Sequence, residues 1–264
     1  MTDANATSAA SEVRSRLCPQ EPEHNTLLRT FYSVPRAGQD LSDGGGPFGF
    51  DITTALQVDH LMRAYGCDGV VESGTHCGDT AEYLARMYPA LPIRTCEIDS
   101  TYAAVAKYRL RDLPNAEVHV GDSALLVPEL VRGLDRPLVF LDAHWRDNWP
   151  LRAELAAVDR GVVVIDDFDI GHPRFGYDHY DGVVCGPKLI RDTLDSTARM
   201  YVGNPLADYP LPCLQVGRRS GTGYLLRDLD DAAVARKAWF APVLLRPRLV
   251  TPDWNVPAMG EERA

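Results

Sequence analysis

VVESGTHCGDT, residues 70–80, is the segment on which the predicted architecture of this chain depends. An apolar strand ends here in an acid, Glu72, and glycines at 74 and 78 let the backbone turn tightly and approach a ligand closely. A pattern typical of a helix follows at once over residues 80–87. A strand, a glycine-rich turn and a helix in this order indicate the first unit of an α/β sheet that binds a small molecule.

The same alternation of strand and helix continues downstream of this segment. The predicted strands are 69–72, 93–98, 117–120, 137–141 and 161–165, and the predicted helices are 80–87, 102–111, 124–131 and 151–158. Residues 161–165 read GVVVI, which is typical of a strand buried on both faces. The pattern therefore predicts an α/β fold: a Rossmann-like, doubly wound, mostly parallel sheet with helices on both faces.

The ends of the chain differ from this regular middle. Residues 1–24 are small and polar and are predicted to be a tail, whereas 241–264 contain four prolines and are predicted to be irregular. Between them, 25–240 form one predicted domain that begins with a helical extension, and residues 188–194 add a helix. Strands predicted at 199–202 and 223–226 would close the sheet with an antiparallel end.

Composition excludes several classes of protein. The net charge of −10 argues against a nucleic-acid partner, because binding to phosphates requires a basic face. The six cysteines form no C-x-x-C pair, which argues against a zinc ribbon and is typical of reduced thiols in a cytoplasmic protein. The chain shows no signal peptide and no apolar run of membrane-spanning length. We therefore expect a cytoplasmic protein with a small-molecule substrate and no membrane partner, and a homo-oligomer is compatible with the sequence.

Acids follow three successive predicted strands, at the edge where such sheets bind ligands. Glu72 would repel a pyrophosphate and attract an ammonium group, such as the amino group of a methionine moiety. Glu97, or Asp99 as the alternative, can bind the two hydroxyls of a ribose. Asp122, followed by Ser123, can accept a hydrogen bond from an adenine amino group. Each acid taken alone is as well explained by a helix cap or a solvated turn.

A second group of acids follows the fourth and fifth predicted strands. Asp142, Asp166 and Asp167 would converge there, and three carboxylates without a counter-charge raise one another's pKa. Oxygen ligands of this kind favour Mg²⁺, with Mn²⁺ or Ca²⁺ as alternatives. Neighbouring strand residues point to opposite faces, so Asp166 and Asp167 can share a metal only if the chain leaves strand geometry between them. Otherwise Asp166 accepts backbone hydrogen bonds and Asp167 faces solvent.

Three histidines near these acids are candidates for a role with the substrate. His144 is the predicted general base, because its pKa lies near working pH; alternatively it orients Asp142. His172 and His179 lie in a glycine- and aromatic-rich loop, residues 171–180, that can close over a substrate. For each of them, a place on the protein surface is the favoured interpretation.

Over roughly residues 50–230 the sequence resembles class I S-adenosylmethionine-dependent methyltransferases. Glu72, Gly74 and Gly78 match their first motif, Glu97 the acid that binds the ribose, and Asp122 the acid on the adenine side. The resemblance implies that the cofactor S-adenosylmethionine is bound by Glu72, Gly74, Thr75, Gly78, Thr80, Glu97, Asp122 and Ser123.

The second acidic group resembles that of metal-dependent O-methyltransferases of the macrocin type and of cephalosporin-hydroxylase-like methyltransferases. Asp142, Asp166 and Asp167 match the metal ligands of those families, but His144 and Trp145 stand where macrocin-type members often carry an acid and a tyrosine. The resemblance implies divalent-metal-assisted O-methylation of a small polar metabolite or a natural-product sugar, with Asp142 and His144 in the catalytic step.

Three other functions stay open. A nicotinamide oxidoreductase would need the G-x-G-x-x-G spacing, which is absent here. A non-catalytic Rossmann-like protein that binds a nucleoside would keep the fold without turnover. A metal-dependent hydrolase would use the second acidic group but would leave Glu72, Glu97 and Asp122 unexplained.

Overall fold

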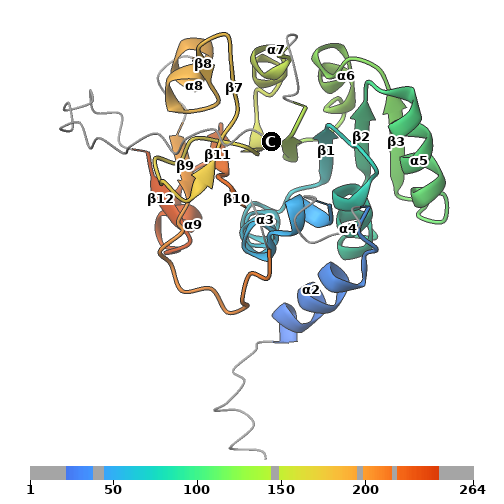
Figure 1. Ribbon diagram of the computed structural model, residues 1–264, viewed down its shortest axis with the longest axis horizontal. Helices are drawn as coiled ribbons and strands as arrows, with labels where there is room; N and C mark the ends of the chain where they lie inside the picture. Colours follow the sequence, from blue (N-terminus) through green and yellow to red (C-terminus); the bar gives the residue numbers. More distant parts are fainter. Residues whose placement is uncertain (1–21, 38–44, 144–148, 195–198, 216–218, 244–264) are drawn as a thin grey trace, which may run out of the picture.

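The computed structural model describes residues 22–37, 45–143, 149–194, 199–215 and 219–243. Its centre is an eight-stranded sheet in the order β12-β9-β11-β5-β4-β1-β2-β3 (Figure 1). The predicted tails, 1–24 and 241–264, lie largely outside the described residues. Helix α2 (Pro22–Ser33) begins within the first of these ranges, and strand β12 (Phe240–Pro242) ends within the second.

The parallel part of the sheet is confirmed as predicted. Its five strands are β1 (Gly69–Ser73), β2 (Ile93–Glu97), β3 (Ala116–Val120), β4 (Pro137–Leu141) and β5 (Gly161–Ile165). β1 pairs with β2 on one side and with β4 on the other, so the winding direction of the sheet reverses between β1 and β4. In an open α/β sheet a ligand binds at the carboxyl ends of the strands beside such a reversal.

The remaining strands close the sheet in antiparallel fashion. β11 (Gly223–Arg227) lies between β5 and β9 (Arg199–Gly203) and runs antiparallel to both, and β12 adds an edge strand that was not predicted. Two short pairs lie outside the main sheet: β6 (Phe175–Gly176) with β10 (Arg219–Ser220), and β7 (His179–Tyr180) with β8 (Val183–Val184).

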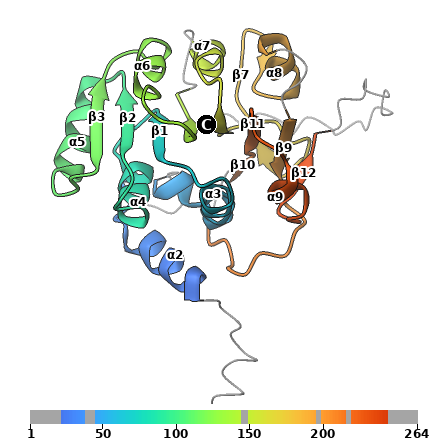
Figure 2. The ribbon, with the colours of Figure 1, turned by 180° about the vertical axis from the view of Figure 1, so that it is seen from behind.

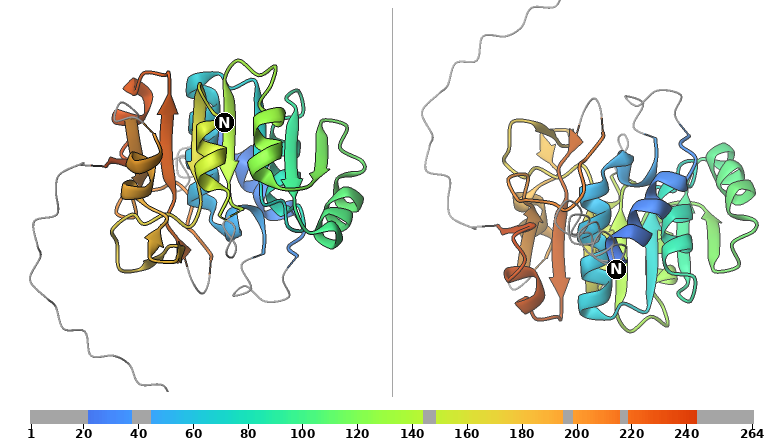
Figure 3. Two further views of the ribbon diagram at one scale, coloured as in Figure 1. Left: turned by 90° about the horizontal axis from the view of Figure 1, so that it is seen from above. Right: turned by 90° about the horizontal axis from the view of Figure 1, so that it is seen from below.

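Helices form a layer on each face of the sheet (Figures 1 and 3). One layer contains α2, the 3₁₀ turn η1 (Pro47–Phe50), α3 (Ile52–Tyr65), α4 (Asp79–Met87) and α9 (Ala232–Ala235). The other contains α6 (Ser123–Leu130), α7 (Leu151–Ala156) and α8 (Pro187–Thr193), while α5 (Ser100–Leu110) packs beside β3. Figure 2 shows α2 lying outward of α3 and α4 on the same side of the sheet.

Alternate residues of the central strands supply the two cores, because successive side chains of a strand point to opposite faces. Val70 belongs to the core under α3 and α4, whereas Val71 belongs to the core under α6 and α7. Every residue of β5 is buried, as the GVVVI sequence predicts. No helix among these described ranges is both long and apolar enough to span a bilayer.

Candidate functional site

The turn after β1 is built from left-handed backbone conformations. Gly74 and Gly78 have φ angles of 80° and 84°, and His76 between them has a φ of 48°. The amide of Gly78 donates to the carbonyl of Thr75 at 2.8 Å, which closes the turn directly before α4. Glycine adopts such angles at little cost, so the turn requires glycine at both positions.

Gly74 also brings this turn against the segment after β4. A Cβ atom at Gly74 would lie 2.4 Å from the carbonyl oxygen of Asp142, closer than any side chain could approach. The amide of Asp142 in turn donates to the carbonyl of Ser73 at 3.1 Å. The turn after β1 and the segment that follows β4 are therefore in direct contact at the backbone of Asp142.

Glu72 lies beneath the turn and is 2% exposed. The hydroxyl of Thr95 donates to its Oε2 at 2.5 Å. Burial raises the pKa of Glu72 to about 8, although the hydrogen bond from Thr95 lowers it and the nearby carboxylates of Asp79 and Glu97 raise it further. The protonated form of Glu72 is thus favoured at neutral pH.

Thr75 and Thr80, which were predicted to bind the cofactor, make hydrogen bonds within the protein. Thr75 is buried, and its Oγ1 lies 2.5 Å from Oγ1 of Thr95. The hydroxyl of Thr80 accepts the amide of Phe48 at 3.0 Å. Both side chains hold the turn and the first residues of α4 in place.

Glu97 follows β2 and is fixed by two backbone amides. His76 donates to its Oε2 at 2.7 Å, and Asp99 donates to its Oε1 at 2.9 Å. The carboxylate of Asp99 instead caps α5, accepting the amides of Thr101 and Tyr102 at 2.7 and 3.2 Å, and these bonds lower its pKa. Of the two acids considered for the ribose, only Glu97 touches the glycine-rich turn.

Asp122 caps α6, because its carboxylate accepts the amide of Ala124 at 2.9 Å. Behind it lies a carboxylate that sequence analysis missed: Glu154 of α7 is fully buried. Burial raises the pKa of Glu154 to about 7, and the hydroxyls of Ser123 and Ser73 lower it in part. An acid on the inner face of an amphipathic helix carries no signal of its own in the sequence.

Asp142, Asp166 and Asp167 follow the neighbouring strands β4 and β5, close enough for their charges to interact. Burial and the charges of Asp166 and Asp167 raise the pKa of Asp142 well above its usual range. Burial and the charge of Asp167 do the same for Asp166. Asp178, from the loop after β5, contributes to both shifts and was not predicted as part of this group.

The chain does leave strand geometry after Asp166. Asp167 has a φ of 47°, so it does not simply point to the opposite face from its neighbour. Its carboxylate accepts the hydroxyl of Ser220, and its carbonyl accepts the amide of Asp178 at 2.9 Å. Within the described ranges, however, no three His, Cys, Asp or Glu side chains are arranged to hold a metal ion.

An arginine that the sequence did not single out lies beside this acidic group. Arg219 donates from Nη2 to Asp51 at 2.7 Å, and its guanidinium lies over the ring of Phe175 at 4.8 Å. Asp51 caps α3 by accepting the amide of Thr53 at 2.8 Å, and its charge reaches Asp166. Arg219 therefore contacts both Asp51 and Phe175, and Asp51 links this group to the acids that follow β5.

The structure describes two of the three histidines that were predicted to act near the substrate. His144 lies outside the described residues. His172 accepts the amide of Arg174 at Nδ1, 3.2 Å away, and its ring meets Phe175 edge to face at 5.5 Å. His179 is exposed on β7. The loop that carries both histidines thus also supplies Phe175 and Asp178 to the site.

Comparison with known proteins identifies relatives but no matching family model. Catechol O-methyltransferase of Mus musculus is 32% identical over 132 residues, which cover 45% of this chain and 49% of the relative. The Bos taurus enzyme of the same name is 26% identical over 172 residues, or 56% of this chain and 62% of the relative. The chain thus matches about half the length of these curated relatives.

Among solved structures, the chain is similar to the O-methyltransferase TomG from Streptomyces achromogenes in complex with S-adenosylmethionine. The identity is 22% and the TM-score 0.48, over 83% of this chain and 96% of that one. Through its curated relatives, the predicted resemblance to class I S-adenosylmethionine-dependent methyltransferases is confirmed in sequence over about half of the chain.

Proposed function

We propose that this chain is an S-adenosylmethionine-dependent O-methyltransferase that acts on a small polar acceptor with the help of a divalent cation. The proposal is supported by the relatives, which are named as O-methyltransferases, and by the two groups of acids at the carboxyl ends of the strands. The observation that carries it is the contact between Gly74 and the backbone of Asp142, which joins the cofactor turn to the acidic group.

The residues of the turn fit the cofactor. Both oxygens of Glu97 are oriented by backbone amides and keep lone pairs with which to accept hydrogen bonds from ribose hydroxyls. Glu72 would provide a negative charge near the turn once an ammonium group there favours its ionised form. Gly74, Thr75, Gly78 and Thr80 shape the backbone around these acids, and Asp122 and Ser123 flank the expected adenine position.

The chemistry of the second acidic group fits a hard cation, because a positive ion beside Asp142 and Asp166 would offset the burial and the neighbouring negative charges that raise the pKa of both carboxyls. Mg²⁺ or Mn²⁺ held by Asp142, Asp166 and Asp167 would lower the pKa of an acceptor hydroxyl. His144, two residues after Asp142 in the sequence, is the proposed acceptor of the hydroxyl proton.

The class of acceptor is proposed from the resemblance to macrocin-type enzymes and from the names of the relatives. The resemblance to macrocin-type enzymes suggests a natural-product sugar, and the relatives are named for catechol. Both kinds of molecule carry neighbouring hydroxyl groups. We propose that the acceptor offers two adjacent oxygens to the acidic group, with Arg219 and Phe175 beside it.

Two measurements, made one after the other, test the proposed function. Calorimetry should show binding of S-adenosylhomocysteine and no binding of NAD. Mass spectrometry of reactions with S-adenosylmethionine, Mg²⁺ and a panel of catechols and sugar diols should then reveal a methylated product. Binding of NAD alone would favour an oxidoreductase. Cofactor binding with no product from any vicinal diol would favour the non-catalytic nucleoside-binding protein.

A further inference from the structure

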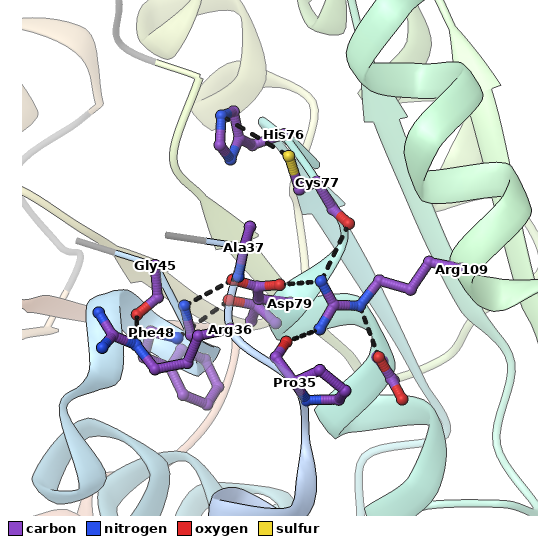
Figure 4. Close-up of polar contacts among 12 residues, drawn as sticks. Pro35, Arg36, Ala37, Gly45, Phe48, His76, Cys77, Asp79 and Arg109 are labelled. Carbon is purple, nitrogen blue, oxygen red and sulfur yellow. Dashed lines mark hydrogen bonds and ion pairs between the residues drawn. The ribbon is translucent and has the colours of Figure 1, made fainter. Parts of the chain in front are cut away.

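The first residue of α4, Asp79, holds two points of the N-terminal segment. Its Oδ2 accepts the amide of Ala37 at 3.2 Å and the amide of Gly46 at 2.5 Å (Figure 4). Asp79 is buried and directly follows Gly78, the last glycine of the cofactor turn. A single carboxylate therefore joins the chain that precedes α3 to the turn between β1 and α4.

Arg109 of α5 connects the same parts from the other side. Its Nε donates to Glu82 at 2.5 Å, and its Nη1 donates to Asp79 and to the carbonyl of Cys77. Its Nη2 donates to the carbonyl of Pro35 (Figure 4). One guanidinium thus contacts α4, the cofactor turn and the N-terminal segment, which its planar fork of donors allows and a lysine ammonium would not.

The ion pairs that Arg109 makes with Asp79 and Glu82 are largely buried, so each partner depends on the others for a compensating charge. The side chains of Asp79 and Glu82 are 9% and 5% exposed, and that of Arg109 is 14% exposed. Removing one partner of a buried ion pair leaves an uncompensated charge, which is far costlier than losing an exposed pair. Arg86 reaches Glu82 at 2.7 Å, but Asp79 has no cation other than Arg109 among the described residues.

Arg109 also packs against the turn itself. A Cβ atom at Gly78 would lie 3.5 Å from Cδ of Arg109 and 3.3 Å from Cβ of Ala106. The carbonyl of Cys77 that Arg109 binds is one residue from His76, whose amide holds Glu97. Displacing Arg109 would therefore loosen the segment that orients the proposed ribose acid.

We infer that Asp79 and Arg109 are positioning residues for the cofactor, and that the docking of residues 35–37 and 45–48 on them is coupled to cofactor binding. The inference rests on the proposed function, because it takes the turn as the cofactor site. A ligand on the turn and the N-terminal segment on Asp79 favour the same conformation of residues 77–79, so each strengthens the binding of the other.

The test compares Arg109→Lys and Asp79→Asn with Arg111→Gln in the full chain. Arg111 also lies at the end of α5, but its side chain is 51% exposed and contacts Asp112 and the carbonyl of Tyr108 rather than the turn. Calorimetry should show a dissociation constant for S-adenosylhomocysteine raised at least tenfold by the first two changes and less than twofold by the third.

Hydrogen exchange of the backbone amides distinguishes this coupling from a purely structural role of Asp79 and Arg109. In the wild-type protein, S-adenosylhomocysteine should slow exchange of the amide of Gly46 and its neighbours, and this slowing should be lost in folded Arg109→Lys. Unchanged affinity in that variant, or no slowing in the wild-type protein with ligand bound, would overturn the coupling while leaving the proposed function intact. If the wild-type protein binds no S-adenosylhomocysteine, the proposed function is wrong, and the coupling, which rests on it, is wrong as well.

Discussion

Glu72 has an ionisation state that responds to what binds the turn above it. Burial raises its pKa to about 8, so the protonated form is favoured at pH 7. An ammonium group close to it would favour the charged form and lower that pKa. The ionisation of Glu72 on ligand binding can therefore be detected through the proton that it releases, in addition to any effect on affinity.

We predict that S-adenosylhomocysteine binding at pH 7 releases a proton, approaching one per molecule bound. The measurement is calorimetry in buffers with different ionisation enthalpies, where the apparent heat should differ between buffers. Adenosine lacks the amino-acid part and serves as the control, for which the heats should agree. Equal heats for S-adenosylhomocysteine would mean that Glu72 does not meet the ammonium group.

A second prediction concerns Glu97. Glu97→Ala should weaken S-adenosylhomocysteine binding by about 1–3 kcal/mol, because ribose hydroxyls would lose their acceptor. Asp99→Ala provides the comparison, since Asp99 caps α5 and does not touch the turn. If the folded Glu97 variant kept its affinity and the Asp99 variant lost it, the ribose role would pass to Asp99.

At the scale of single elements, α7 carries a buried acid against β1 and α6. The pKa of Glu154 is raised in the folded state, so the folded protein binds more protons than the unfolded chain between the ordinary glutamate pKa and about 7. Its contribution to stability is therefore present at low pH and is lost as pH rises through about 7. The loss amounts to at most about 3 kcal/mol.

We predict that Glu154→Gln removes this dependence, because an amide does not ionise. The free energy of unfolding of the variant, relative to the wild-type protein, should rise between pH 5 and pH 8 in denaturant titrations. Taking the difference cancels Glu72, which is common to both proteins. Glu129→Gln is the control, since the side chain of Glu129 is 55% exposed and pairs with Arg132, whose charge does not change in this pH range, so it should give no such trend. A difference that stays constant with pH would contradict the assignment.

At the scale of the whole molecule, the acids of β4 and β5 meet residues from distant parts of the chain. We predict that EDTA abolishes methyl transfer, that Mg²⁺ or Mn²⁺ restores it, and that Asp142→Asn causes the same loss because an amide keeps the shape without the charge. S-adenosylhomocysteine binding should survive both treatments, as the donor site uses other residues. Asp192→Asn, on the exposed face of α8, is the matched control. Full turnover in EDTA with a metal-free preparation would show that the acids are structural.

The parallel half of the fold could be predicted because its information is local: apolar runs alternate with helical patterns, and each strand ends in a glycine or an acid. β12 could not, because three residues that include Pro242 carry no strand pattern. Asp142, Asp166 and Asp167 were predicted from their place after strands. Asp178 and Arg219 were not, because they reach the site through the two-residue pairing of β6 with β10 and the short turn around it.

The antiparallel pairing of β5 with β11 has a consequence for how the chain is made. β5 can pair with β4 as soon as it is synthesised, but β11, its other neighbour, follows about 60 residues later. At typical rates of translation this leaves one edge of the GVVVI strand open for about 3–12 s. An apolar open edge can pair with another nascent chain, so stalled synthesis before Gly223 should yield aggregates, and a chaperone that covers this edge should improve the yield of native protein.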